Sequence, residues 1–83
     1  MRNFATPYFV TGIDETETEE GRFFNLRVRG MDSSYSKIIS SLPYENFKAL
    51  PGEDDIIYVH SRPDGIVTKI QTAKDELLYS REI

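Results

Sequence analysis

Short apolar runs of strand length, separated by turn residues, constrain the fold of this chain more than any other feature of its sequence. Aromatic and β-branched residues, which are typical of strands, fill most of these runs. The runs span residues 8–13, 22–29, 35–40, 55–60, 65–72 and 76–80. This pattern predicts a β-rich domain in which short connections join antiparallel neighbours.

The run at 22–29 carries the clearest alternation in the chain. From Phe24 onward every second residue is apolar, through Leu26 to Val28. Successive side chains of a strand point to opposite faces, so these three residues are expected to face the core. The residues between them are expected on the opposite face: Phe23, Asn25, Arg27 and Arg29.

Residues 42–50 are the best candidate for a helix. Ser41 can cap its start and Pro43 is tolerated in a first turn. Three apolar side chains recur at a spacing of three and would line one helix face: Tyr44, Phe47 and Leu50. Pro51 and Gly52 would end the helix. The preceding run at 35–40 is open to two interpretations, a third strand or an extension of this helix.

The expected fold class is therefore mainly β with one short helix (α+β), in the order β-β-β-α-β-β-(β). A small antiparallel barrel or a curled sheet fits this order, and by architectural analogy the barrel would be OB-like or SH3-like. No motif in the sequence supports one of these architectures over the other.

Length and composition indicate one small domain, residues 1–83, without disulfides or thiolate metal sites, because the chain has no cysteine. It contains one histidine, His60, and no apolar stretch that approaches a membrane span. The N-terminal residues lack the apolar region of a secretory signal, so we expect a cytoplasmic location.

The formal net charge of −4 is unevenly distributed, and residues 14–20 hold five of the 14 acidic residues. This segment is too polar for a core and is predicted to form an acidic hairpin loop over 14–21. A basic stretch follows it, which includes Arg22, Arg27, Arg29 and Lys37. Local potential is therefore more informative here than the overall charge.

The leading hypothesis for function is a non-enzymatic binding module that takes single-stranded nucleic acid. An exposed ring beside guanidinium groups can stack bases and meet phosphates. The expected contacts are Phe23, Asn25, Arg27, Arg29 and Lys37. The competing structural interpretation packs Phe23 in a second layer and leaves the arginines as solvated strand charges. The acidic loop could screen Arg27 and Arg29 within the same molecule.

The alternative is a protein-interaction or inhibitor module, homodimeric in one version, of a kind that occurs in phages and mobile elements. It would use Phe23 and the apolar run 56–59, by face packing or strand-edge pairing. Its acidic loop would meet a basic partner through Glu15, Glu17, Glu19 and Glu20.

An enzyme is the least supported class. The chain has no nucleophile elbow, no cysteine nucleophile and no glycine-rich phosphate loop. His60 at a strand end is expected to be structural or exposed. No metal site or cofactor is expected, because the acidic segment lacks the glycine and glutamate spacing of a calcium loop.

Overall fold

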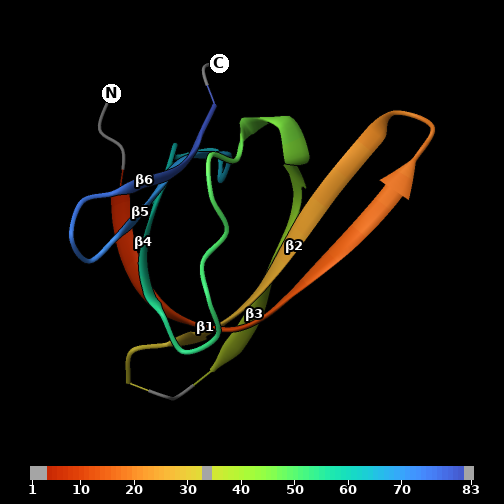
Figure 1. Ribbon diagram of the computed structural model, residues 1–83. Helices are drawn as coiled ribbons and strands as arrows, with labels where there is room; N and C mark the ends of the chain where they lie inside the picture. The colour runs from red at the N-terminus through yellow and green to blue at the C-terminus, as the bar shows by residue number, and fades with distance from the viewer. Residues whose placement is uncertain (1–3, 33–34, 82–83) are drawn as a thin grey trace.

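The computed structural model describes residues 4–32 and 35–81, and within them the chain forms six strands and one short helical turn (Figure 1). These are β1 (Phe4–Thr18), β2 (Gly21–Gly30), β3 (Ser36–Pro43), the 3₁₀ turn η1 (Tyr44–Asn46), β4 (Ile56–Ser61), β5 (Val67–Thr72) and β6 (Leu77–Ser80). Residues 36–43 are thus a strand, which decides between the two interpretations of that segment.

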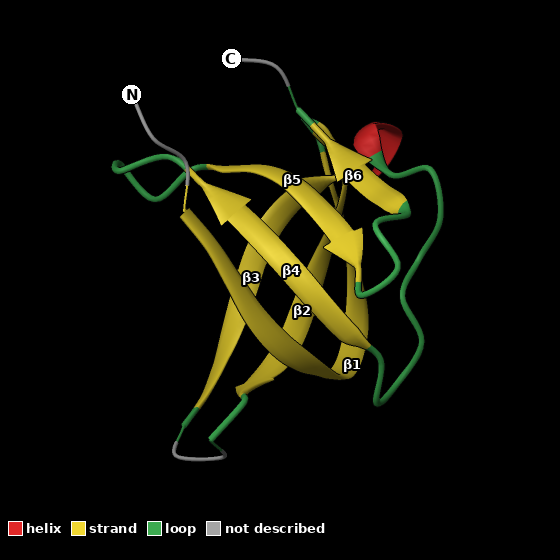
Figure 2. Ribbon diagram, turned by 90° about the vertical axis from the view of Figure 1, so that its left-hand side faces the viewer, coloured by secondary structure: helices red, strands yellow, loops and turns green. Residues whose placement is uncertain are grey.

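All six strands belong to one antiparallel sheet with the order β3-β2-β1-β4-β5-β6, and the sheet curls around its core without closing (Figure 2). The prediction of a small antiparallel β-domain is confirmed. The long strand β1 lies between β2 and β4, so it links the β2–β3 hairpin on one side to strands β4, β5 and β6 on the other.

The inner face of the curl holds the hydrophobic core. Phe24, Leu26 and Val28 are all buried, as the alternation in β2 predicts. The other strands contribute side chains with the same period. Among the described residues the buried hydrophobic core is Tyr8, Val10, Phe24, Leu26, Val28, Ile39, Leu42, Ile57, Val59, Ile70, Leu78 and Tyr79.

Irregularities in strand register accompany the curvature, and two of them involve β2. The β1–β2 register shifts between Val10 and Gly12, and the β2–β3 register shifts between Phe24 and Leu26. An extra residue on one strand increases the local twist and bends the sheet. The β1–β2 hairpin consequently projects beyond the other strands (Figure 1).

The acidic loop is shorter than the sequence suggests. β1 runs to Thr18 and pairs with Gly21, so only Glu19 and Glu20 form the turn rather than the whole of 14–21. Gly21 has a φ of 136°, a conformation that favours glycine, and the Thr18 hydroxyl accepts from the Glu20 N–H at 3.2 Å. Cross-strand partners extend the ladder into the acidic segment.

The prediction of a helix over 42–50 is wrong, because the helical part of this segment is a single 3₁₀ turn at Tyr44–Asn46. Phe47 is extended and forms an isolated bridge with Tyr79 of β6. Its ring lies 4.8 Å from the Tyr79 ring and 5.3 Å from the Phe24 ring, measured between centroids. Packing across the sheet thus overrides the three-residue spacing, and Leu50 is left 48% exposed.

Candidate binding surfaces

The residues of β2 that point away from the core form what we call the outer face: Phe23, Asn25, Arg27 and Arg29, with Phe9 from β1. Phe23 is half-buried rather than sealed in the core, and Arg27 is exposed. Because Arg27 and Arg29 alternate with buried neighbours, their side chains leave the same side of the sheet. The sequence-predicted ring and two guanidinium groups are therefore brought to one face.

Arg29 is held against an aromatic ring. Its guanidinium carbon lies 5.1 Å from the centroid of Phe9, its partner in the ladder. Among the described residues its Nε has no hydrogen-bond partner, although that atom is buried. Stacking on Phe9 orients the group without using its hydrogen-bond donors.

Arg27 is held by a carboxylate. Its Nε lies 3.1 Å from Asp14 Oδ2, and both side chains are about half-exposed. The side chain crosses over Gly12, where a Cβ would come within 2.3 Å of Arg27 Nη2. Such an exposed ion pair contributes little to stability, so a competing anion can replace the carboxylate at small cost.

The Asn25 amide makes two hydrogen bonds within the sheet. Its Nδ2 donates to Thr16 Oγ1 at 2.9 Å, and its Oδ1 accepts from the Ser41 N–H at 3.0 Å. The side chain thus ties together β1, β2 and the irregular part of β3, where Ser41 has a φ of 60°. Both ends of the amide are used within the fold, which does not suit the predicted ligand contact.

Lys37 lies on the opposite side of the sheet from the arginines. It pairs with buried Val28 and therefore points to the inner face, where its Nζ lies 5.0 Å from the Tyr8 ring centroid. The sequence-based grouping of Lys37 with Arg27 and Arg29 is wrong. The run at 35–40 showed no alternation from which its register could be predicted.

Strand pairing adds two outer-face rings that the sequence did not indicate. Phe9 pairs with Arg29 in the ladder, and Tyr58 of β4, 38% exposed, pairs with Pro7 two residues earlier in β1. Both rings belong to apolar runs, and the sequence alone does not show which side of the sheet each ring faces until the neighbouring strands are known. The run 56–59 lies in β4 between β1 and β5, so it cannot serve as a strand edge.

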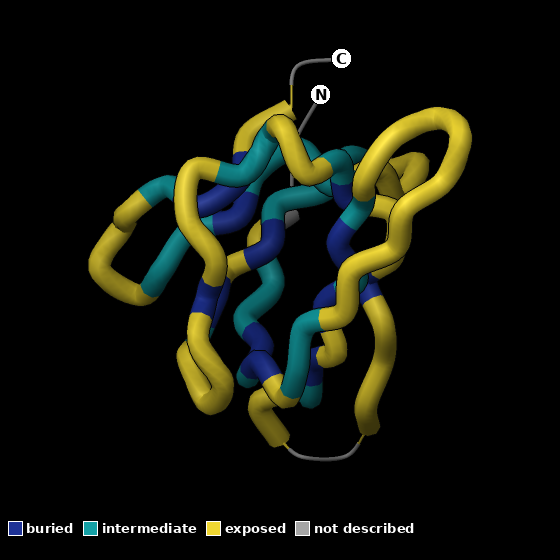
Figure 3. Tube along the Cα trace, turned by 45° about the vertical axis from the view of Figure 1, so that its right-hand side comes forward, coloured by how far each residue is buried: buried dark blue, intermediate teal, exposed yellow. Residues whose placement is uncertain are grey.

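The projecting hairpin carries the acidic residues predicted to meet a protein partner. Residues 14–22 are exposed along both strands (Figure 3). Glu15 is engaged by Arg22, whose Nε donates to Glu15 Oε1 at 2.6 Å, and this bond raises the pKa of the guanidinium. Arg22 also lies over the Tyr44 ring at 4.5 Å. Glu17, Glu19 and Glu20 remain exposed at the tip.

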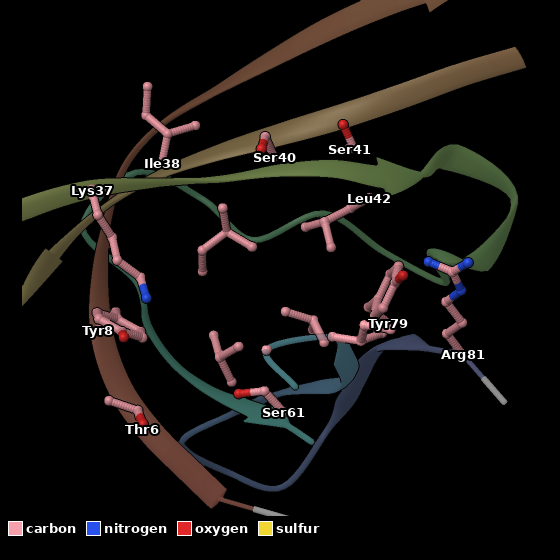
Figure 4. Close-up of a pocket in the computed structure, with 15 residues that line it drawn as sticks. Thr6, Tyr8, Lys37, Ile38, Ser40, Ser41, Leu42, Ser61, Tyr79 and Arg81 are labelled. Atoms are coloured by element: carbon pink, nitrogen blue, oxygen red, sulfur yellow. The ribbon is translucent and has the colours of Figure 1, made fainter. Parts of the chain in front are cut away.

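A cleft of about 510 Å³ opens on the inner side, between β3 and strands β4 to β6 (Figure 4). Its lining combines apolar side chains, among them Ile39, Leu42 and Val67, with the hydroxyl groups of serine, threonine and tyrosine residues. Lys37 lies at one end beside Tyr8, and Arg81 lies at the other beside Tyr79. No carboxylate lines it among the described residues. This cleft could not be predicted from the sequence, because its lining comes from β1, from β3 and from the segment between Val59 and Arg81.

His60 has an ordinary structural role. Its Nε2 lies 2.9 Å from Gln71 Oε1 on the neighbouring strand β5. Across residues 4–32 and 35–81 there is no group of three or more residues arranged to hold a metal ion. Within the same ranges no helix is long and apolar enough to cross a membrane.

The fold and these surfaces define the chain as a small antiparallel β-domain with three candidate binding surfaces: the outer face, the acidic hairpin and the inner cleft. Comparisons with known protein families, with curated proteins and with solved structures found no match. Functional inference therefore depends on the surfaces themselves.

Proposed function

We propose that this chain is a non-enzymatic binding module that takes single-stranded nucleic acid on its outer face. The observation that carries the proposal is the placement of two guanidinium groups, Arg27 and Arg29, between aromatic rings on one side of the sheet. Rings stack bases, at about 1–3 kcal/mol per base, and arginines meet phosphates. A cytoplasmic location is consistent with a chain without cysteine.

The strand arrangement supports the finer proposal that the architecture is OB-like rather than SH3-like. β1 lies between β2 and β4, β2–β3 and β4–β5 are hairpins, and the sheet stays partly open. OB-type barrels are partly open and bind oligonucleotides on the face of their second and third strands. Here β2 supplies both arginines of the outer face.

The test is a titration with a fluorescein-labelled oligothymidylate of about twelve nucleotides, followed by anisotropy at several salt concentrations. Binding is expected to weaken with salt by about 0.7 log units per log unit of salt for each phosphate contacted. The double variant Arg27→Ala/Arg29→Ala should lower that slope by about 1.4.

Lys48→Ala/Lys74→Ala is the matched control, since it removes the same charge from exposed positions in the connections on either side of β4 and β5. Circular dichroism of each variant checks that the fold is retained. Binding that ignores salt, or that survives loss of both arginines, overturns the proposal.

A second candidate, binding of a basic protein surface by the acidic hairpin, is favoured by the way β1 and β2 extend beyond their neighbours. β4 pairs with β1 only from Phe4 to Phe9, so the acidic half of β1 has β2 as its ladder partner in the described chain. Nuclear magnetic resonance (NMR) titration with a lysine-rich peptide should shift the amides of 14–22, and Glu17→Gln/Glu19→Gln/Glu20→Gln should abolish the shifts. Shifts elsewhere would exclude this use of the hairpin, and sedimentation of the chain alone tests for a homodimer.

A further inference from the structure

We infer that the inner cleft binds an extended peptide with acidic ends and an apolar middle, which adds to β3 as a further strand. This site is separate from the outer face and does not depend on the proposed nucleic-acid binding. It combines a strand edge, an apolar floor and two cations.

The strand edge is the first component of the site. β3 (Ser36–Pro43) is the terminal strand of the sheet and pairs with β2 on one side only, within the described residues. At the other end of the sheet, β6 is partly covered, because the Lys48 N–H donates to the Leu78 carbonyl at 2.8 Å and Phe47 bridges Tyr79. An edge strand presents backbone donors and acceptors that an incoming extended chain can satisfy.

The regular part of this edge is at its beginning. Ser36 to Ile39 keep an unbroken register with β2, before the irregularity opposite Asn25. The Ile38 and Lys37 side chains leave β3 on opposite sides, Lys37 toward the interior of the cleft (Figure 4), and Ile38 is 61% exposed. Ile39 borders the cleft and is buried. Side chains of an added strand would alternate in the same way, so every second one would enter the cleft.

The charges of the cleft select the occupant. The chain as a whole has a net charge of −4, yet this cleft contains Lys37 and Arg81 and, among the described residues, no acidic side chain. The two cations lie at opposite ends with apolar side chains between them (Figure 4). An occupant with a carboxylate at each end and apolar residues between is complementary to this arrangement.

The probe is the peptide acetyl-Glu-Thr-Val-Thr-Val-Thr-Glu-amide, whose palindromic sequence presents the same groups in either direction along β3. Its inward positions are Glu, Val, Val and Glu, and its length of about 23 Å approaches that of β3. NMR titration of the ¹⁵N-labelled chain is expected to shift the amides of residues 36–39. A peptide with lysine in place of both glutamates should bind at least about tenfold more weakly.

Two N-methylated versions test strand addition directly. One carries methyl groups on the amides of the inward residues and the other on those of the threonines. Alternate residues of a strand direct their hydrogen bonds to opposite sides, so only one version should lose binding. Equal binding by both versions would show that the peptide does not pair with β3.

Substitution in the protein gives the second readout. Lys37→Glu/Arg81→Glu should weaken binding of the glutamate peptide at least about tenfold, whereas Lys74→Glu/Lys48→Glu, at exposed positions outside the cleft, should change it less than about twofold. The proposal is overturned if the two double variants bind alike, or if up to about 1 mM peptide produces no shift at 36–39. It is also overturned if dilution of the protein alone moves those amides and sedimentation shows a dimer, since a second copy would then occupy the edge.

Discussion

Two glycines of the β1–β2 hairpin are constrained for different reasons at the residue scale. Gly12 has a side chain above it, since an added Cβ would lie 2.3 Å from Arg27 Nη2, whereas Gly21 has open space but a φ of 136°. Gly12→Ala should cost less than about 0.5 kcal/mol, because a flexible exposed guanidinium can move aside. Gly21→Ala should cost about 1 kcal/mol or more, because its backbone is strained for any other residue. Urea unfolding of both variants checks this order, and the reverse order would contradict it.

The buried hydroxyl of Tyr79 gives a second residue-scale prediction. Burial raises the pKa of this phenol above its ordinary value of 10.0, although the neighbouring Asn46 and Arg81 side chains oppose the rise. Above pH 10 the unfolded chain releases the proton while the folded chain retains it, so the free energy of unfolding should fall as pH rises. Tyr79→Phe should remove part of that fall and change stability at pH 7 by less than about 1 kcal/mol. Thermal unfolding from pH 7 to 11 measures both effects, and a Tyr79→Phe profile that matches the parent would contradict the assignment.

At the scale of the element, Asn25 fixes the register of three strands. Its two hydrogen bonds reach Thr16 in β1 and Ser41 in β3, where the β2–β3 ladder is irregular. Asn25→Ala should lower the free energy of unfolding by about 1–2 kcal/mol, because it removes both of these hydrogen bonds. Thr16→Ala should cost less, since it removes only one of the two hydrogen bonds. Equal costs in urea unfolding would mean that the contact with Ser41 carries no special weight.

The elements themselves were predictable wherever one local pattern determined them. β2 was recognised from its alternation, because a strand with one buried face needs that period. The helix prediction for 42–50 was wrong, because it relied on the helical spacing of Tyr44, Phe47 and Leu50. In the structure Phe47 packs against Phe24 and Tyr79, which are distant in sequence. Ladder partners similarly extended β1 through residues whose charge suggested a loop.

At the scale of the whole molecule, the arrangement of surfaces depends on strand order, which single runs do not contain. The outer-face arginines were predicted because both lie on one strand. The rings of Phe9 and Tyr58 were not, because β1 and β4 bring them there. The inner cleft needs β3 and β6 on opposite sides of a curl, and Lys37 is assigned to it only by its register with Val28.

Phe47 is the residue through which the β3–β4 connection contacts both β2 and β6. Phe47→Ala should cost about 2–4 kcal/mol, because it removes a ring packed between Phe24 and Tyr79. Leu50→Ala in the same connection should cost less than about 1 kcal/mol, since Leu50 is 48% exposed. Urea unfolding compares the two variants directly. A helix over 42–50, with both residues on one buried face, would instead make the costs similar.

The uneven charge of the molecule gives a last prediction, which concerns how the hairpin affects the outer face. Asp14 already holds Arg27, and the exposed tip continues the same two strands. Glu17→Gln/Glu19→Gln/Glu20→Gln takes the net charge from −4 to −1 and should tighten oligothymidylate binding at least about threefold at low salt. The control Glu53→Gln/Asp75→Asn/Glu76→Gln gives the same net charge from exposed positions outside the hairpin. If the hairpin variant gains more oligothymidylate affinity than the control, the hairpin charges act locally on the outer face. This difference should disappear near 1 M salt, where the Debye length is about 3 Å. Equal gains would mean that overall charge alone governs the encounter, and no gain in either would remove the screening role.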